Sequence, residues 1–140
     1  MIERMLARAL VVAAILVSGV APSAAADATG VWARPNGASR IEISPCGGAL
    51  CGRIVWMRSP QPDTRNPDPA RRSEPLVGRR IMSGLKPTKK PAEWKGEIYN
   101  AEDGRTYTGY ATLVGPDSLK LEGCVLGGLI CKGETWTRAK

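Results

Sequence analysis

The chain has 140 residues, with 20 Lys and Arg against 13 Asp and Glu, which gives a formal net charge of +7 at pH 7. It contains no His, which excludes His general bases, Ser-His and Cys-His nucleophile pairs, and metal sites with His ligands. A hydrophobic fraction of 43% and a charged fraction of 24% are typical of a globular domain.

The first 26 residues have the pattern of a secretory signal peptide. Arg4 and Arg8 precede an apolar run at residues 10–17, and a run of three alanines ends at Ala26. We predict a signal peptide over residues 1–26, cleaved after Ala26, which leaves residues 27–140 as a single periplasmic or secreted domain. A membrane anchor is the alternative, but the apolar run is shorter than the roughly 20 residues that span a bilayer.

The rest of the chain is typical of short β-strands joined by turns. Polar and apolar residues alternate with a period of two in several segments, which indicates strands with one buried face. About eight strands are predicted, at residues 31–32, 39–44, 54–57, 77–82, 94–98, 106–113, 119–122 and 134–137. Turn signals at residues 103–104 and 115–117 separate some of them. We predict an all-β fold, a small antiparallel up-and-down barrel, because closure removes the sheet edges.

A transmembrane barrel of similar size is the alternative. Its outer face would need apolar side chains against lipid, whereas the predicted outward positions carry Lys, Arg and Glu. We therefore expect a barrel that is apolar inside and polar outside, and not an integral membrane protein.

Four cysteines lie in the predicted exported part, where disulfides are the usual state. The pairs Cys46–Cys51 and Cys124–Cys131 each straddle a Gly-containing two-residue turn, the first centred on residues 48–49. Facing residues of a hairpin bring their β-carbons to about 5 Å, near disulfide range, so we predict these two disulfides. A four-cysteine zinc site is the alternative, but C-x4-C and C-x6-C arms do not have the tight spacing of structural zinc knuckles.

Residues 58–95 form a stretch rich in proline and arginine. They contain seven of the eleven prolines, ten basic residues and four acidic residues. Such a concentration of positive charge suits an anionic partner, either a small ligand or an anionic component of the cell envelope. A solvated loop is the alternative. Nucleic acid is not expected, because no aromatic residues alternate with the basic ones in this loop.

This stretch also supplies the candidate ligand-binding residues. Two prolines stiffen the segment from Asn66 to Pro69, and the guanidinium groups of Arg71 and Arg72 suit a carboxylate or phosphate. We predict that the loop covers one mouth of the barrel, where Arg72, assisted by Arg71, meets the anionic head of a largely apolar ligand. The alternative is that Asp68 and Arg72 pair with each other and pin the loop. Four aromatic residues on flanking strands are candidates for an apolar wall or for core packing: Trp56, Trp94, Tyr99 and Tyr107.

Ordered motifs run through nearly the whole predicted mature chain. They include Gly30-Val31-Trp32, Ile41-Glu42-Ile43-Ser44-Pro45-Cys46, Leu50-Cys51-Gly52-Arg53, Asn66-Pro67-Asp68-Pro69, Trp94-Lys95-Gly96-Glu97-Ile98-Tyr99-Asn100 and Leu119-Lys120-Leu121-Glu122-Gly123-Cys124. Together they resemble the bacterial family called domain of unknown function 2147. The chain departs from the family's common pattern at Ala101, where many members have Pro, and at residues 70–74. The resemblance implies a lipocalin-like β-barrel exported to the envelope or beyond, with no established activity.

The first and last predicted strands carry residues that resemble the closure pair of lipocalin-like barrels. Trp32 lies in a Gly-x-Trp motif, and Arg138 is a basic residue on the last strand. Closure places these strands side by side, where a guanidinium over an indole contributes roughly 0.5–2 kcal/mol. We therefore expect Trp32 and Arg138 to stabilise the barrel rather than to bind a ligand.

Three classes of function are compatible with these features. A carrier or sensor that holds a small molecule in the barrel mouth is preferred, and an envelope interaction module that uses the basic loop is the alternative. An enzyme is disfavoured, because Asp68, Glu97 and Asp103 show no paired spacing. We predict no catalytic residue, metal or cofactor, and the sequence leaves the oligomeric state open.

Overall fold

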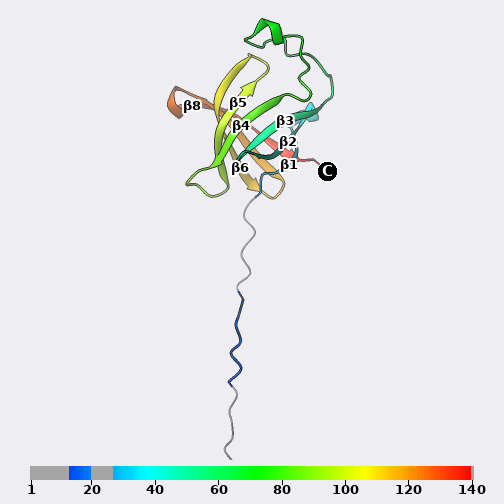
Figure 1. Cartoon of the computed structure of the whole chain (residues 1–140). Helices are drawn as coiled ribbons and strands as arrows, with labels where there is room; N and C mark the ends of the chain where they lie inside the picture. Colours follow the sequence, from blue (N-terminus) through cyan, green and yellow to red (C-terminus); the bar gives the residue numbers. More distant parts are fainter. Residues whose placement is uncertain (1–12, 20–26, 140) are drawn as a thin grey trace, which may run out of the picture.

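A computed structural model describes residues 13–19 and 27–139, and eight antiparallel strands within them close into a barrel. The strands are β1 (Gly30–Ala33), β2 (Ser39–Cys46), β3 (Ala49–Met57), β4 (Arg80–Pro87), β5 (Glu93–Asn100), β6 (Arg105–Gly115), β7 (Ser118–Val125) and β8 (Ile130–Arg138). Each strand pairs with the next along the chain, and β1 also pairs with β8. Figure 1 shows the strands wrapped around a common axis. The predicted all-β, up-and-down barrel is confirmed.

One predicted strand is misplaced along the chain. The segment predicted at residues 77–82 is a strand only from Arg80 onward, because Gly78 adopts a φ of +93° and Arg79 closes a turn onto the carbonyl of Leu76. The predicted cleavage site after Ala26 lies outside the described residues. Within residues 13–19 and 27–139, no helix is long and apolar enough to cross a membrane.

The barrel interior is packed with large apolar side chains over part of its length. Alternate residues of the strands face inward, apart from a register shift in β4 that lets both Met82 and Leu85 do so. Among the inward residues, Trp32, Ile43, Met82, Leu85 and Leu119 have at most 1% of their surface exposed. The cross-strand neighbours Gly52 and Met82 show how tightly this part is filled, because a β-carbon on Gly52 would lie 2.7 Å from the Met82 sulfur. This packed core occupies the interior that the alternating pattern predicts.

The disulfide Cys46–Cys51 is present, as predicted, but its hairpin turns one residue earlier than the sequence pattern suggests. Cys46 pairs with Ala49 in the register, so the turn consists of residues 47–48. Two consecutive glycines with φ of +59° and +80° make this tight turn possible. The two cysteines are therefore diagonal rather than opposite partners, and their Cα atoms are 5.9 Å apart.

The second predicted disulfide, Cys124–Cys131, is also present and joins direct register partners on β7 and β8. Its turn is wider than predicted. A single turn of 3-10 helix, η3 (Leu126–Gly128), and Leu129 separate the two strands. The two disulfides together engage all four cysteine sulfur atoms.

Closure of the barrel brings Trp32 and Arg138 together as register partners on β1 and β8. The guanidinium carbon of Arg138 lies 4.3 Å from the centre of the Trp32 ring. Arg138 also donates hydrogen bonds to the carbonyls of Thr29 at 2.8 Å and Pro116 at 3.1 Å, and the indole of Trp32 donates to the carbonyl of Ala28 at 2.9 Å. Arg138 thus ties the N-terminal segment and the β6–β7 turn to the closing strand.

The proline-rich stretch forms mainly the long connection from β3 to β4, over residues 58–79. It contains one short helix, η2 (Pro69–Arg71), while another, η1 (Pro35–Gly37), connects β1 to β2. Figure 1 shows this loop in green, at the same end of the barrel as the yellow β5–β6 turn. The loop therefore lies at the end where the connections β1–β2, β5–β6 and β7–β8 also gather.

Candidate ligand cavity

A cavity of about 540 Å³ lies at this end of the barrel. Most of its wall is apolar and comes from inward-facing residues of several strands. The principal apolar residues are Ile41, Ile54, Ile98, Leu121 and Trp136. Ligand pockets in proteins typically have volumes of about 300–1,000 Å³ and mostly apolar walls with a few polar groups. The cavity therefore has the size and composition of a small-molecule site.

The cavity exists partly because β7 has a glycine where a side chain would otherwise project inward. Gly123 lines the cavity, and a β-carbon built there would meet only the side chain of Tyr107, at 3.6 Å. That distance is an ordinary van der Waals contact, so the position tolerates a small side chain. A larger one would occupy the cavity.

An ion pair forms the main polar feature of the wall. Arg34 Nε and Nη2 donate to the two carboxylate oxygens of Glu134 at 2.7 and 3.1 Å, and the Trp136 indole donates to Glu134 at 2.6 Å. Burial raises the pKa of Glu134, but the hydrogen bonds from Arg34 and Trp136 outweigh it and hold that pKa below its usual range. The hydrogen bond to Glu134 likewise raises the pKa of Arg34. Both side chains are therefore charged, and each binds the other's charge.

The mouth of the cavity carries further charged groups. Lys132 lines it from β8, two residues before Glu134, and makes no ion pair among the described residues. Glu102 and Asp103 line it from the β5–β6 turn. The hydroxyl of Tyr107 donates to Asp103, and this hydrogen bond lowers the pKa of Asp103. Lys132 is thus a basic lining residue without an ion-pair partner in the described part of the chain, and its ammonium suits an anionic ligand.

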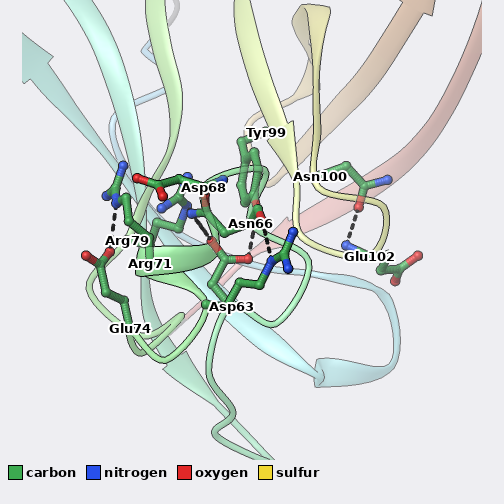
Figure 2. Close-up of polar contacts among 10 residues, drawn as sticks. Asp63, Asn66, Asp68, Arg71, Glu74, Arg79, Tyr99, Asn100 and Glu102 are labelled. Atoms are coloured by element: carbon green, nitrogen blue, oxygen red, sulfur yellow. Dashed lines mark hydrogen bonds and ion pairs between the residues drawn. The ribbon is translucent and has the colours of Figure 1, made fainter.

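The long loop is anchored beside the cavity by Asp63, which is buried and which Figure 2 shows at the centre of the polar contacts. Its carboxylate accepts hydrogen bonds from the Tyr99 hydroxyl at 2.7 Å and from the Asn66 amide at 2.9 Å, and Arg79 Nε lies 3.3 Å away. The Arg79 guanidinium also stacks on the Tyr99 ring, 4.1 Å from its centre. Burial and the hydrogen bond to Asp63 raise the pKa of Tyr99 to about 12.

A second contact fixes the loop to the β5–β6 turn. A β-carbon on Gly104 would lie only 1.8 Å from the carbonyl oxygen of Arg65, so the two backbones approach as closely as glycine allows. Gly104 also has a φ of +70°, which the turn requires. The loop therefore packs against the rim formed by this turn.

The structure places the predicted arginines on the loop and not among the residues that line the cavity. Arg71 pairs with Glu74 at 3.1 Å, and Arg72 Nε donates to the carbonyl of Asn66 at 2.9 Å. Asp68 accepts from the backbone N–H of Ala70 at 3.0 Å instead of pairing with Arg72. Pinning of the loop through an Asp68–Arg72 pair is therefore wrong, and Asp63 pins it instead.

The four predicted aromatic residues lie in different surroundings. Tyr99 and Tyr107 line the cavity. Trp94 is buried in the core, while Trp56 is 42% exposed and stacks with Arg40, whose guanidinium carbon is 5.3 Å from its ring centre. Only the two tyrosines thus belong to the candidate site.

Sequence reasoning did not identify Asp63, Arg34, Lys132 or Glu134 as site residues. The alternating pattern could have indicated two of them. Lys132 and Glu134 lie at alternate positions of β8, on the same face as the core residue Trp136. No signal was available for Asp63, which is one of several charges in a loop whose path depends on tertiary contacts.

Comparisons with known proteins agree with this architecture. A family model described as an uncharacterised protein conserved in bacteria (DUF2147) matches residues 30–138. A similar solved structure is protein HP1028 from Helicobacter pylori, described as a member of the lipocalin family. The two share 21% sequence identity and a TM-score of 0.72, over 81% of this chain and 84% of that one. Comparison with curated proteins gives no match. At this identity the similarity establishes a lipocalin-like fold.

Proposed function

The chain belongs to the DUF2147 family of uncharacterised bacterial proteins, and we propose that it is an exported carrier or sensor of a small, largely apolar ligand. The cavity of about 540 Å³ at one end of the barrel is the observation that carries this proposal. Its wall of Ile, Leu and Trp side chains suits an apolar body, because burying apolar surface contributes about 25 cal/mol per Å². The two disulfides support export to an oxidising compartment, the periplasm or the exterior.

We assign recognition of an anionic head group to Lys132. Its ammonium stands at the mouth beside the apolar wall and has no ion-pair partner among the described residues. Arg34 is less available because Glu134 binds two of its nitrogen atoms. Glu102 and Asp103 line the same mouth and weaken its attraction for anions. Apolar contacts therefore supply most of the affinity, and the head group mainly sets orientation.

Filling the cavity tests whether it is the binding site. We expect the parent protein to bind a fluorescent fatty-acid probe saturably and Gly123→Leu to lose that binding. Gly123→Ala is the matched control, because its β-carbon fits at 3.6 Å from Tyr107. Melting curves of both variants establish that they fold. No binding by the parent protein, or equal binding by a folded Gly123→Leu variant, would overturn the carrier proposal.

A second pair of variants tests the head group. Lys132→Ala should weaken binding of the same probe by about tenfold, the effect of losing roughly 1.4 kcal/mol, while Arg72→Ala should leave it unchanged. The opposite result would place the head group at the loop. Equal affinities for both variants and the parent would show that no charged contact of this kind forms.

The proposed function is non-catalytic. The three carboxylates considered as acid–base groups come from different elements, with Asp68 on the long loop, Glu97 exposed on β5 and Asp103 in the β5–β6 turn. Asp68 and Asp103 are also engaged in local turns, through hydrogen bonds from the backbone N–H groups of Ala70 and Arg105. These local hydrogen bonds support structural roles for Asp68 and Asp103.

Binding of an anionic envelope component is the second candidate. An open groove of about 440 Å³ on the loop is lined by three arginines and one glutamate: Arg71, Arg79, Arg80 and Glu74. Ion pairs to Glu74 and Asp63 already engage Arg71 and Arg79. Dextran sulfate is a suitable probe, and Arg80→Ala should weaken its binding if this groove is used. The carrier is preferred because the groove's charges are largely satisfied internally.

A further inference from the structure

The β7–β8 hairpin ends in an unusual cluster of exposed apolar side chains. We define the hairpin tip as Val125, Leu126, Leu129 and Ile130, whose exposed fractions are 40%, 69%, 85% and 58%. The disulfide between Cys124 and Cys131 holds its base together. Figure 1 shows this hairpin in orange beside the label of β8, standing away from the barrel wall.

Folding does not explain the choice of leucine at position 126. Leu126 has a φ of +52°, a left-handed conformation that non-glycine residues rarely adopt and that Asn or Gly would adopt at lower cost. Its side chain is mostly exposed, so packing does not compensate the strain. A strained residue that is not stabilised by packing points to a function for its side chain.

We propose that the hairpin tip docks the protein on a phospholipid bilayer by inserting its apolar side chains among the lipids. Four side chains on a narrow turn cannot bury the roughly 1,000 Å² or more that a stable protein interface needs. A protruding apolar turn can instead enter a bilayer surface without a complementary partner. Lys132 lies two residues after Ile130, and its positive charge suits anionic lipid head groups.

The hairpin tip adjoins the cavity, so docking on a bilayer would affect how a ligand enters. Val125 and Ile130 belong both to the tip and to the lining of the cavity, so apolar surface is continuous from the tip to the interior. A bilayer at the tip would therefore face the cavity mouth, and an apolar ligand would pass between them with little exposure to water. This consequence rests on the proposed function, whereas docking itself does not.

Co-sedimentation with vesicles tests docking. The protein is recovered after export, with its N-terminus determined by mass spectrometry, and mixed with phosphatidylcholine vesicles that contain some phosphatidylglycerol. We expect the parent to bind and the double variant Leu126→Asp/Leu129→Asp to bind at least about tenfold more weakly. Val114→Asp is the matched control, because Val114 is 59% exposed near the β6–β7 turn at the other end of the barrel. Its binding should equal that of the parent.

Leu126→Asn provides a readout that is independent of any folding defect. Asn suits the left-handed conformation, so this variant should melt at the same or a higher temperature while binding vesicles more weakly. A parent that stays in solution, or tip variants that bind as well as Val114→Asp, would overturn the proposal. A parent that forms a dimer, dissociated by the tip variants in sedimentation equilibrium, would assign the tip to self-association instead. Since no ligand is needed, loss of fatty-acid binding in Gly123→Leu with vesicle binding intact separates the two proposals.

Discussion

The Tyr99 hydroxyl donates a hydrogen bond of 2.7 Å to Asp63, which joins the long loop to strand β5 beside the cavity. Asp63 is almost completely buried, and a buried carboxylate is tolerable only when charged or polar partners surround it. Asn66 and Arg79 supply the remaining partners. The loop of residues 58–79, which contains five prolines, is thus held by a buried acidic residue and its three partners, together with Leu76 in the core and the close approach of Arg65 to Gly104.

Tyr99→Phe should destabilise the fold by about 1.5–3 kcal/mol, the range for losing a hydrogen bond to a charged group. Thermal unfolding measures this change, and faster proteolysis within residues 58–79 should accompany it. Tyr107→Phe is the control, because its hydroxyl bonds to the exposed Asp103 and its removal should have a much smaller effect. Equal melting temperatures for Tyr99→Phe and the parent would show that Asp63 does not depend on this hydrogen bond.

The raised pKa of Tyr99 also predicts how stability changes at high pH. Burial and the Asp63 hydrogen bond favour the neutral phenol, so the pKa rises to about 12 in the folded protein from about 10 in the unfolded chain. The associated stability is complete below about pH 10 and is lost as the pH rises towards 12. Ultraviolet titration of the phenols should show a step near pH 12 that disappears in Tyr99→Phe. A step near pH 12 that persists in this variant would contradict the assignment.

The lowered pKa of Glu134 predicts that stability also changes at low pH. Its folded-state pKa is lowered, because the hydrogen bonds from Arg34 and Trp136 outweigh burial. The ionised Glu134 therefore stabilises the folded protein above the ordinary glutamate pKa of about 4.3. This stabilisation is lost as the pH falls through the lowered pKa of the folded state. Glu134→Gln should cost about 1 kcal/mol or less at pH 7, since the pair is partly exposed. The difference in unfolding free energy between Glu134→Gln and the parent should vanish at acidic pH. A difference that grows at acidic pH would contradict the assignment.

Much of the barrel could be predicted because strand parity and local turns depend on neighbouring residues. Alternation at residues 39–44 and 119–122 identified strands of the barrel, and the short spacing within each cysteine pair identified both disulfides. The β2–β3 turn was displaced by one residue, because two adjacent glycines at residues 47–48 form a tighter turn than the centred spacing suggested. Local patterns thus determine the element more reliably than its exact register.

The site was harder to predict because its residues meet only after the barrel closes. Arg34 and Glu134 are separated by 100 positions and pair through the adjacency of β1 and β8. The sequence drew attention to Arg71 and Arg72, where charge is most concentrated, yet these side chains make local contacts on the loop. Concentration of charge along the chain therefore did not indicate where charge faces the cavity.

The disulfides predict separable effects on stability and docking. Cysteines five and seven positions apart close short loops, so removing either bridge by double Cys→Ser substitution should cost about 2–3 kcal/mol. Non-reducing peptide mapping should recover only Cys46–Cys51 and Cys124–Cys131. Loss of the second bridge should also weaken vesicle binding, since it lies at the base of the hairpin tip, while loss of the first should not. A linked peptide of Cys46 with Cys124 would contradict the hairpin assignment.

Arg138 predicts how strongly barrel closure contributes to stability. Its guanidinium stacks on Trp32 and donates to the carbonyls of Thr29 and Pro116, so Arg138→Ala removes a cation–π contact and several hydrogen bonds at once. We expect a loss of about 1–3 kcal/mol, with roughly 4–8 °C of melting temperature for each kcal/mol in a domain of this size. Arg138→Lys should recover only part of this, because an ammonium keeps the charge but cannot bond both carbonyls from a planar fork. Probe binding in the cavity should persist below the melting temperature of each variant. A variant that keeps its stability but loses the probe would move Arg138 from the closure of the barrel to the ligand site.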